Sequence, residues 1–149
     1  MGPQGVPGPA GTGGPRGVVA YGSVTANQSN ITTVVDLTGL TATWTANPTR
    51  TYRTTAFFNM NSSVAGDASE VDLVDAAATV KQWAFVRLTG AGVSEFHTVS
   101  VVETGLSGTV TRKVQAKRVA GTGALMMVAN ANAPAYIVVE DFTFLAGTT

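Results

Sequence analysis

The chain has 149 residues, of which 12% are charged, with nine Lys or Arg balanced by nine Asp or Glu. A neutral chain with so little charge lacks the electrostatic footprint of a nucleic-acid-binding or membrane-surface protein, and its length suits one compact domain. The chain has no cysteine, which excludes disulfides and thiolate metal sites. No apolar run approaches the ~18 residues of a membrane span, so membrane insertion is not expected.

The first seventeen residues carry glycine at every third position. These positions are Gly2, Gly5, Gly8, Gly11, Gly14 and Gly17. Only glycine fits at the crowded axis of three wound polyproline II strands, so the period predicts a collagen-like triple helix of three chains. The alternative is a Pro/Gly-rich leader without fixed structure. Because so few triplets should not hold three chains alone, we expect a stalk at residues 1–17 and a trimerising head domain at residues 18–149.

Beyond the repeat, β-branched and aromatic residues are interrupted by turn residues, which predicts short strands. We expect them at residues 18–25, 31–38, 40–46, 51–61, 79–89, 94–103, 109–119, 124–129 and 135–145. Residues 68–78 fit either a strand or a helix that begins at an Asp67–Glu70 capping box, and the β-rich surroundings favour a strand. About ten strands at this spacing are typical of an all-β, jelly-roll-like sandwich.

Several expected strands carry apolar residues at adjacent positions, which point to opposite faces of a sheet. These pairs are Phe57 and Phe58, Val101 and Val102, Met126 and Met127, and Val138 and Val139. A sandwich covers one face of each sheet, so the other face needs a partner, unless the pairs lie at bulges. We therefore predict a homotrimer, whose interface or core is formed by Phe57, Phe58, Trp83, Met126, Met127, Val138 and Val139.

Residues suited to catalysis are few. The single histidine, His97, falls within an expected strand, where a packed or surface role is usual. The four carboxylates between residues 67 and 75 lack both an adjacent aromatic cluster and the spacing of a calcium loop. The basic run at residues 112–118 lacks stacking aromatics and indicates a solvated or edge strand. We predict a protein that is not an enzyme and has no catalytic residue, metal or cofactor.

Segments along nearly the whole chain resemble one family of virion proteins. They are residues 16–21 (RGVVAY), 35–40 (VDLTGL), 52–53 (YR), 64–67 (VAGD) and 134–141 (PAYIVVED). They are similar to the globular domains that follow collagen-like repeats in proteins of actinobacterial phages, commonly labelled minor tail proteins. The resemblance implies a structural virion protein, made in the host cytoplasm, and provides no catalytic residues.

Three roles follow as expectations. A tail fibre or minor tail component would serve host attachment or assembly, with a host surface glycan or protein as ligand. A capsid decoration or head-fibre protein would contact other virion proteins through its N-terminal stub. A bacterial surface protein resembling the C1q head is the third alternative. For any ligand, we expect the loops at residues 27–30, 62–67 and 90–93 to form the site.

Overall fold

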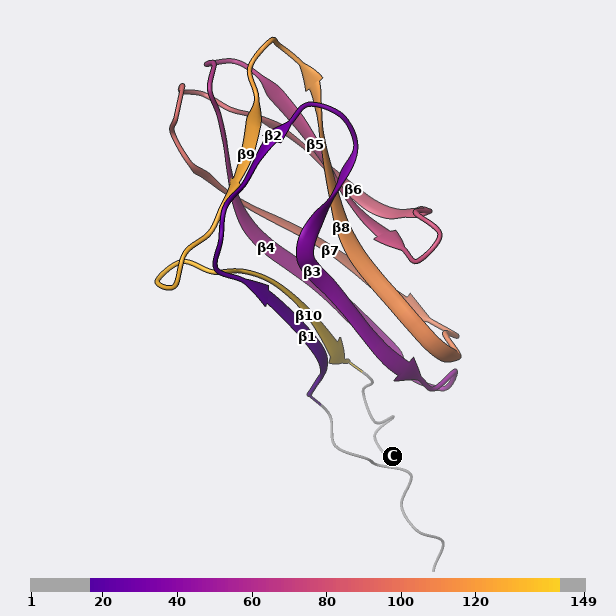
Figure 1. Ribbon diagram of the computed structural model, residues 1–149. Coiled ribbons are helices and arrows are strands. Elements are labelled where there is room, and N and C mark those ends of the chain that lie inside the picture. The colour runs from indigo at the N-terminus through magenta and orange to yellow at the C-terminus, as the bar shows by residue number, and fades with distance from the viewer. Residues whose placement is uncertain (1–16, 143–149) are drawn as a thin grey trace, which may run out of the picture.

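The computed structural model describes residues 17–142, which form ten strands (Figure 1). The strands are β1 (Val18–Val24), β2 (Gln28–Ile31), β3 (Val35–Ala46), β4 (Thr51–Ser62), β5 (Ala68–Asp75), β6 (Val80–Arg87), β7 (Glu95–Thr104), β8 (Gly108–Ala120), β9 (Leu125–Val128) and β10 (Ala135–Asp141). The predicted stalk, with Gly2, Gly5, Gly8, Gly11 and Gly14, lies outside the described residues. Within residues 17–142 there is no helix long and apolar enough to cross a membrane.

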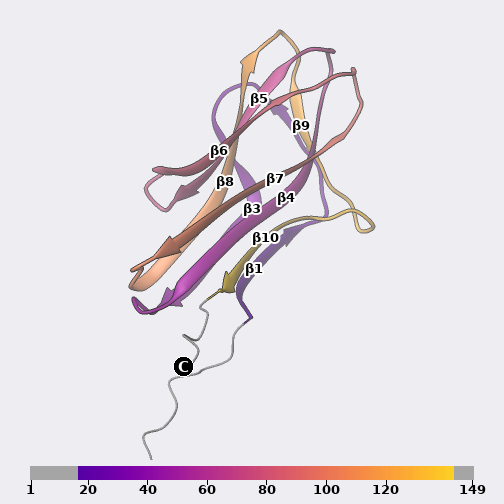
Figure 2. The same ribbon diagram turned by 180° about the vertical axis from the view of Figure 1, so that it is seen from behind.

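The strands pair into two antiparallel sheets. In the first, here called the β4 sheet, β4 pairs with β7 along one edge and with β10 and then β9 along the other, and β1 and β2 extend it (Figure 2). The second, the β8 sheet, has the order β3-β8-β5-β6. Gly17 and Asp141 are joined by a backbone hydrogen bond of 2.9 Å, so the two ends of the described chain lie at one end of the molecule.

The two sheets face each other across one hydrophobic core. Phe58 and Met60 of β4, Leu73 of β5, Val114 of β8 and Ile137 of β10 are all completely buried between the sheets. The two-residue period predicted around Trp44 is present in β3, where Leu40, Ala42, Trp44 and Ala46 are buried and the intervening threonines are exposed. The prediction of an all-β sandwich is confirmed, and residues 68–75 form a strand rather than a helix.

Two details of the strand prediction are wrong. Residues 28–31, expected in and beside a turn, form β2, because they pair with β9. The Gln28 side chain also bonds the backbone of β3, at both its amide nitrogen (3.0 Å) and its oxygen (2.8 Å). The strands expected on either side of Gly39 are one strand, β3. Gly39 has a φ of 85° and lies where the β3–β8 register shifts, so it forms a bulge rather than a break.

The basic run is also placed differently from the prediction. Its strand, β8, lies between β3 and β5 and is not an edge. Arg112 points into the sandwich and is 4% exposed. Its guanidinium donates two hydrogen bonds, of 2.8 and 2.7 Å, to the Glu103 carboxylate and lies 5.9 Å from the ring centre of Trp44. A paired and stacked arginine is tolerated in the interior, which explains why the strand is not solvated on both faces.

The two sheets lie close together where β1 passes β3. A Cβ atom added at Gly22 of β1 would lie 2.5 Å from the backbone oxygen of Thr41 and 3.2 Å from a methyl group of Ile137. Backbone atoms cannot yield as a flexible side chain does, so this corner of the sandwich requires glycine.

We expect Gly22→Ala to lower the free energy of unfolding by about 1–3 kcal/mol, because the added methyl group overpacks the β1–β3 contact. Urea denaturation monitored by circular dichroism measures the change. Ser23→Ala, at an exposed neighbouring position, should stay within about 0.5 kcal/mol of the parent. A Gly22→Ala variant as stable as the parent would show that the corner is not close-packed.

Candidate functional site

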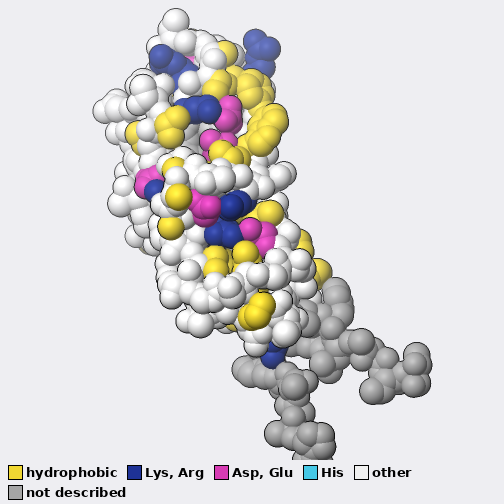
Figure 3. Space-filling view, turned by 90° about the vertical axis from the view of Figure 1, so that its right-hand side faces the viewer, with side chains coloured by type: hydrophobic (Ala, Val, Ile, Leu, Met, Phe, Trp, Pro, Cys, Tyr) yellow, Lys and Arg dark blue, Asp and Glu magenta, His cyan; other side chains and the backbone are white. Residues whose placement is uncertain are grey.

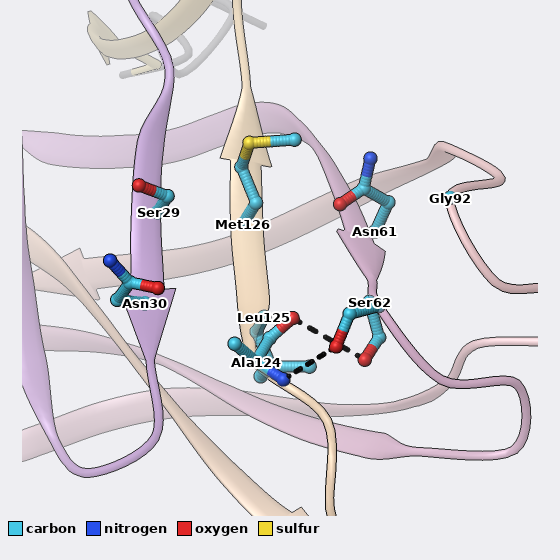
Figure 4. Close-up of a pocket in the computed structure, with 9 residues that line it drawn as sticks. Ser29, Asn30, Asn61, Ser62, Gly92, Ala124, Leu125 and Met126 are labelled. Atoms are coloured by element: carbon cyan, nitrogen blue, oxygen red, sulfur yellow. Dashed lines mark hydrogen bonds between the residues drawn. The ribbon is translucent and has the colours of Figure 1, made fainter.

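A pocket of about 280 Å³ opens at the end of the sandwich where β4 ends (Figure 4). Its lining comes from β2, from the end of β4, from the β6–β7 loop and from the start of β9. The lining residues are Ser29, Asn30, Asn61, Ser62, Ser63, Gly92, Ala124, Leu125 and Met126. The three segments named from the sequence as ligand loops therefore meet here, since each contributes at least one residue, although the first contributes through β2 and not through a loop. The sequence did not indicate the residues from β9.

Backbone hydrogen bonds fix the walls of this pocket. Gly92 N–H donates to the Ser62 carbonyl at 2.7 Å, which ties the β6–β7 loop to β4. Ser63 N–H donates to the Ala124 carbonyl at 3.1 Å, and Ala124 N–H donates to Ser63 Oγ at 3.0 Å. Loops held in this way present their side chains in defined positions, which favours a preformed site.

Asn61 is the most notable polar group of the pocket. The residue is only 8% exposed, yet its side-chain amide makes no hydrogen bond within the described part of the chain. Figure 4 shows it beside Met126, its cross-strand neighbour on β9. Across β9, Asn30 has a φ of 61°, in the left-handed region that few residues other than glycine adopt. An amide that borders a pocket without a protein partner and a residue in the left-handed region both occur at binding sites.

Asp67 supports the pocket from below. Its buried carboxylate accepts a 2.5 Å hydrogen bond from Ser62 Oγ and a 3.1 Å hydrogen bond from Thr122 N–H. Glycine is required around it, since a Cβ at Gly121, where φ is 92°, would lie 1.7 Å from one carboxylate oxygen and a Cβ at Gly123 would lie 2.4 Å from the other. Asp67 thus joins the end of β4 to the β8–β9 loop. The helix cap that the sequence suggested is not formed.

These contacts lower the pKa of Asp67. The Ser62 hydroxyl is the largest cause, followed by the backbone N–H groups of Thr122 and Gly123 and the positive charge of Arg118, while burial acts in the opposite direction. Arg118 in turn donates a hydrogen bond to the Gly123 carbonyl. The ionised carboxylate is therefore the form that holds the loops together.

The other three carboxylates of this segment lie in different surroundings. Glu70 pairs with Lys117 at 2.6 Å, and Asp75 pairs with Lys81 at 2.9 Å, which lowers the pKa of Asp75 to about 2. Asp72 is 5% exposed and its Oδ1 has no hydrogen-bond partner, so burial, and then the charge of Glu70, raise its pKa. Among residues 17–142 no three His, Asp or Glu side chains come close enough to hold a metal ion.

Aromatic side chains do lie beside these carboxylates. Strand β6 pairs with β5 so that Trp83 stands opposite Asp72 and Phe85 opposite Glu70. We call these four residues the acidic–aromatic patch. Trp83 is 57% exposed and Phe85 56% exposed, on the outer face of the β8 sheet, where Figure 3 shows hydrophobic and charged side chains interspersed. In the sequence a turn separates the two carboxylates from the two aromatic residues. The β5–β6 hairpin brings them together, and recognising this hairpin in the sequence would have indicated the patch.

A second aromatic group crosses the outer face of the β4 sheet. Its rings follow one another from β1 to β7, with centroid distances of 6.2 Å (Tyr21–Tyr136), 5.4 Å (Tyr136–Phe57) and 5.5 Å (Phe57–Phe96). We call these four residues the aromatic ladder. The rings at its two ends, Tyr21 and Phe96, are 57% and 65% exposed.

Some of the residues proposed for the interface or core lie between the two sheets, and the others lie on the outer faces of the sandwich. Phe58, Met127 and Val139 are buried between the sheets. Phe57, Met126 and Val138 are half-buried on the outer face of the β4 sheet, and Trp83 lies on the outer face of the β8 sheet.

His97 packs rather than standing in a cleft. Its ring lies 5.9 Å from that of Phe58, and burial lowers its pKa, so the imidazole is neutral at pH 7. The buried Nε2 atom has no hydrogen-bond partner in the described part of the chain.

Comparison with known proteins assigns no family. No family model matches the chain, and no curated protein matches it. Among solved structures, it is similar over 83% of its length to 36% of the protein of particles derived from infectious bursal virus (13% identity, TM-score 0.42). It is also similar over 75% of its length to 27% of an α-amino acid ester hydrolase (9% identity, TM-score 0.39). The third similarity is to a Clostridium thermocellum xylanase 10B, over 89% of this chain and 30% of that one (11% identity, TM-score 0.39). The chain thus spans less than two fifths of each.

We expect Asp67→Asn to lower the free energy of unfolding at pH 7. The difference between variant and parent should disappear as the pH falls. A carboxylate whose pKa is lowered by folding contributes stability above its unfolded pKa of about 4, and that contribution disappears as the pH falls through the folded value. Urea unfolding of parent and variant between about pH 7 and pH 3 measures the difference. Parallel stability profiles would contradict an ionised Asp67 as the link between the loops.

Proposed function

We propose that this chain is a homotrimeric structural protein of a phage virion, a tail fibre or minor tail component that serves host attachment or assembly. In this proposal residues 1–17 form a short collagen-like stalk and residues 18–149 the head. The resemblance to collagen-linked phage domains supports the virion assignment. The oligomeric state is supported by the glycine repeat together with the outer face of the β4 sheet.

The observation that carries the proposal is the position of the aromatic ladder relative to the repeat. Gly17, the last glycine of the repeat, leads directly into β1, which is an edge strand of the β4 sheet. Tyr21 of this strand is the first ring of the ladder. Three chains that leave one triple helix bring three copies of β1 together, so their ladders come to lie near the common axis.

Contact between ladders would remove large apolar rings from water. Exposed aromatic side chains that form a contiguous group usually mark an interaction surface, and aromatic rings contribute strongly at such interfaces. In a closed trimer each chain contacts the next through two different patches, and side chains that lie near the three-fold axis meet their own equivalents in the other two copies. Phe57 and Val138, half-buried on this face, would be covered at the same time.

The head also has a polarity that suits attachment. Gly17 lies near the start of β4, whereas the pocket lies at the end of the same strand, about 35 Å away for twelve extended residues. A stub that contacts other virion proteins would therefore hold the pocket away from the particle.

Electron microscopy of particles of the encoding phage, labelled with an antibody against residues 18–149, tests the proposal. We expect label on the tail. Label on the capsid would contradict the tail assignment and favour a head-fibre or decoration protein, which uses the same stub. Unlabelled particles, with the protein detected on the surface of the bacterium, would contradict a virion role altogether.

A further inference from the structure

We propose that the pocket at the end of β4 binds one neutral sugar ring of a surface glycan, with Asn61 as its principal hydrogen-bonding residue. This inference gives a ligand class to the attachment role and in that sense rests on the proposed function. The binding itself depends only on the contacts within one chain.

No charged side chain lines the pocket, and its surface is mostly apolar with a few polar groups. Asn30 and Asn61 contribute amides and Ser29 and Ser63 contribute hydroxyls, beside apolar surface that includes Met126. Amides and hydroxyls both donate and accept hydrogen bonds, as do the hydroxyls of a sugar. A phosphate or carboxylate ligand would instead favour a cationic side chain, and none of the nine lining residues has one.

Asn61 points to a ligand more directly than the rest of the lining. The residue is 8% exposed, and its amide lacks a hydrogen bond within the described part of the chain and borders the pocket beside Met126 (Figure 4). A ligand hydroxyl at this position would take over the hydrogen bonds that the amide otherwise makes to water, whereas an apolar ligand would displace that water and leave the amide without a partner.

The size of the pocket limits the ligand. Its 280 Å³ lies just below the range of about 300–1,000 Å³ that accommodates drug-sized molecules, so a single ring fits better than an oligosaccharide. Further sugars of a glycan would extend into solvent.

The supporting contacts keep the site in shape without a ligand. Ser62 is held by Asp67 from below and by Gly92 from the side, and both hydrogen bonds are short, at 2.5 and 2.7 Å. A preformed site loses little conformational entropy on binding. Even so, each hydrogen bond replaces one to water, so we expect a dissociation constant on the order of 1 mM for a free monosaccharide.

Weak binding by one chain is compatible with attachment if the protein is trimeric. Three sites on one head bind a multivalent surface with an avidity that can exceed the single-site affinity by about 10²–10⁴. The gain in avidity requires the oligomer, whereas the affinity of a single site is the same in one chain alone.

Titration of the ¹⁵N-labelled full chain with D-glucose, D-galactose, D-mannose and N-acetyl-D-glucosamine, each to about 50 mM, tests the site by NMR. We expect at least one sugar to cause saturable amide shifts at residues 29–30, 61–63, 92 and 124–126. Asn61→Ala should weaken this binding about tenfold, the equivalent of one well-made hydrogen bond to a buried group. Asn132→Ala, which removes an exposed amide from the β9–β10 loop, should leave it unchanged.

A second variant keeps the test decisive if Asn61→Ala does not fold. Asn30→Gly removes an amide from the opposite side of the pocket while suiting the left-handed backbone, and should weaken binding severalfold. The absence of saturable shifts with all four sugars would overturn the proposal, as would shifts centred on Trp83 and Phe85 of the acidic–aromatic patch. Particle labelling is unaffected by either result, so failure of the sugar site and failure of the virion role are distinguishable.

Discussion

Hydrogen bonds along both edges of β4 connect the parts of this molecule that matter for its function. One edge pairs with β7, and the other with β10 and then β9, so the strand joins the two halves of its sheet. Its inward side chains, among them Phe58 and Met60, lie at the centre of the core. Its outward side chains include Phe57 of the aromatic ladder and Asn61 of the pocket. A change in the register of this one strand would therefore displace core, ladder and pocket together.

The two outer faces of the sandwich differ in chemistry although both carry exposed aromatics. On the β8 sheet the charges form pairs across strands, such as Lys117 with Glu70 and Lys113 with Asp36, which is typical of a solvated surface. On the β4 sheet four aromatic rings stand in a continuous row. Water solvates the first arrangement well and the second poorly, so the β4 sheet is the face that we propose for contact between copies of the chain.

Local patterns of the sequence were enough to predict much of this arrangement. The alternation in β3 and the adjacent apolar pair Phe57 and Phe58 indicated strands and opposite faces, because side-chain direction follows directly from strand geometry. Two of the segments at the pocket, residues 62–67 and 90–93, could be named because turn residues mark the ends of strands, whereas residues 27–30 reach it mainly through β2.

Contacts between distant segments could not be predicted in the same way. Asp72 meets Trp83 through the register of the β5–β6 hairpin. Arg112 of β8 is paired in the interior with Glu103 of β7, which is nine residues earlier and belongs to the other sheet. The role of Asp67 depends on glycines that follow it by more than fifty residues. In each case the decisive partner is set by the packing of the sheets and leaves no periodic trace in the sequence.

Light scattering of the purified chain at micromolar concentration tests the central claim, that copies of this chain meet through the aromatic ladder. The account predicts three times the mass of one chain, and a lower mass for Tyr21→Ser combined with Phe96→Ser. Trp83→Ser, a matched change at an equally exposed position on the other sheet, should remain trimeric. A monomeric parent protein, or a trimer that dissociates on Trp83→Ser and not on loss of the ladder rings, would contradict it.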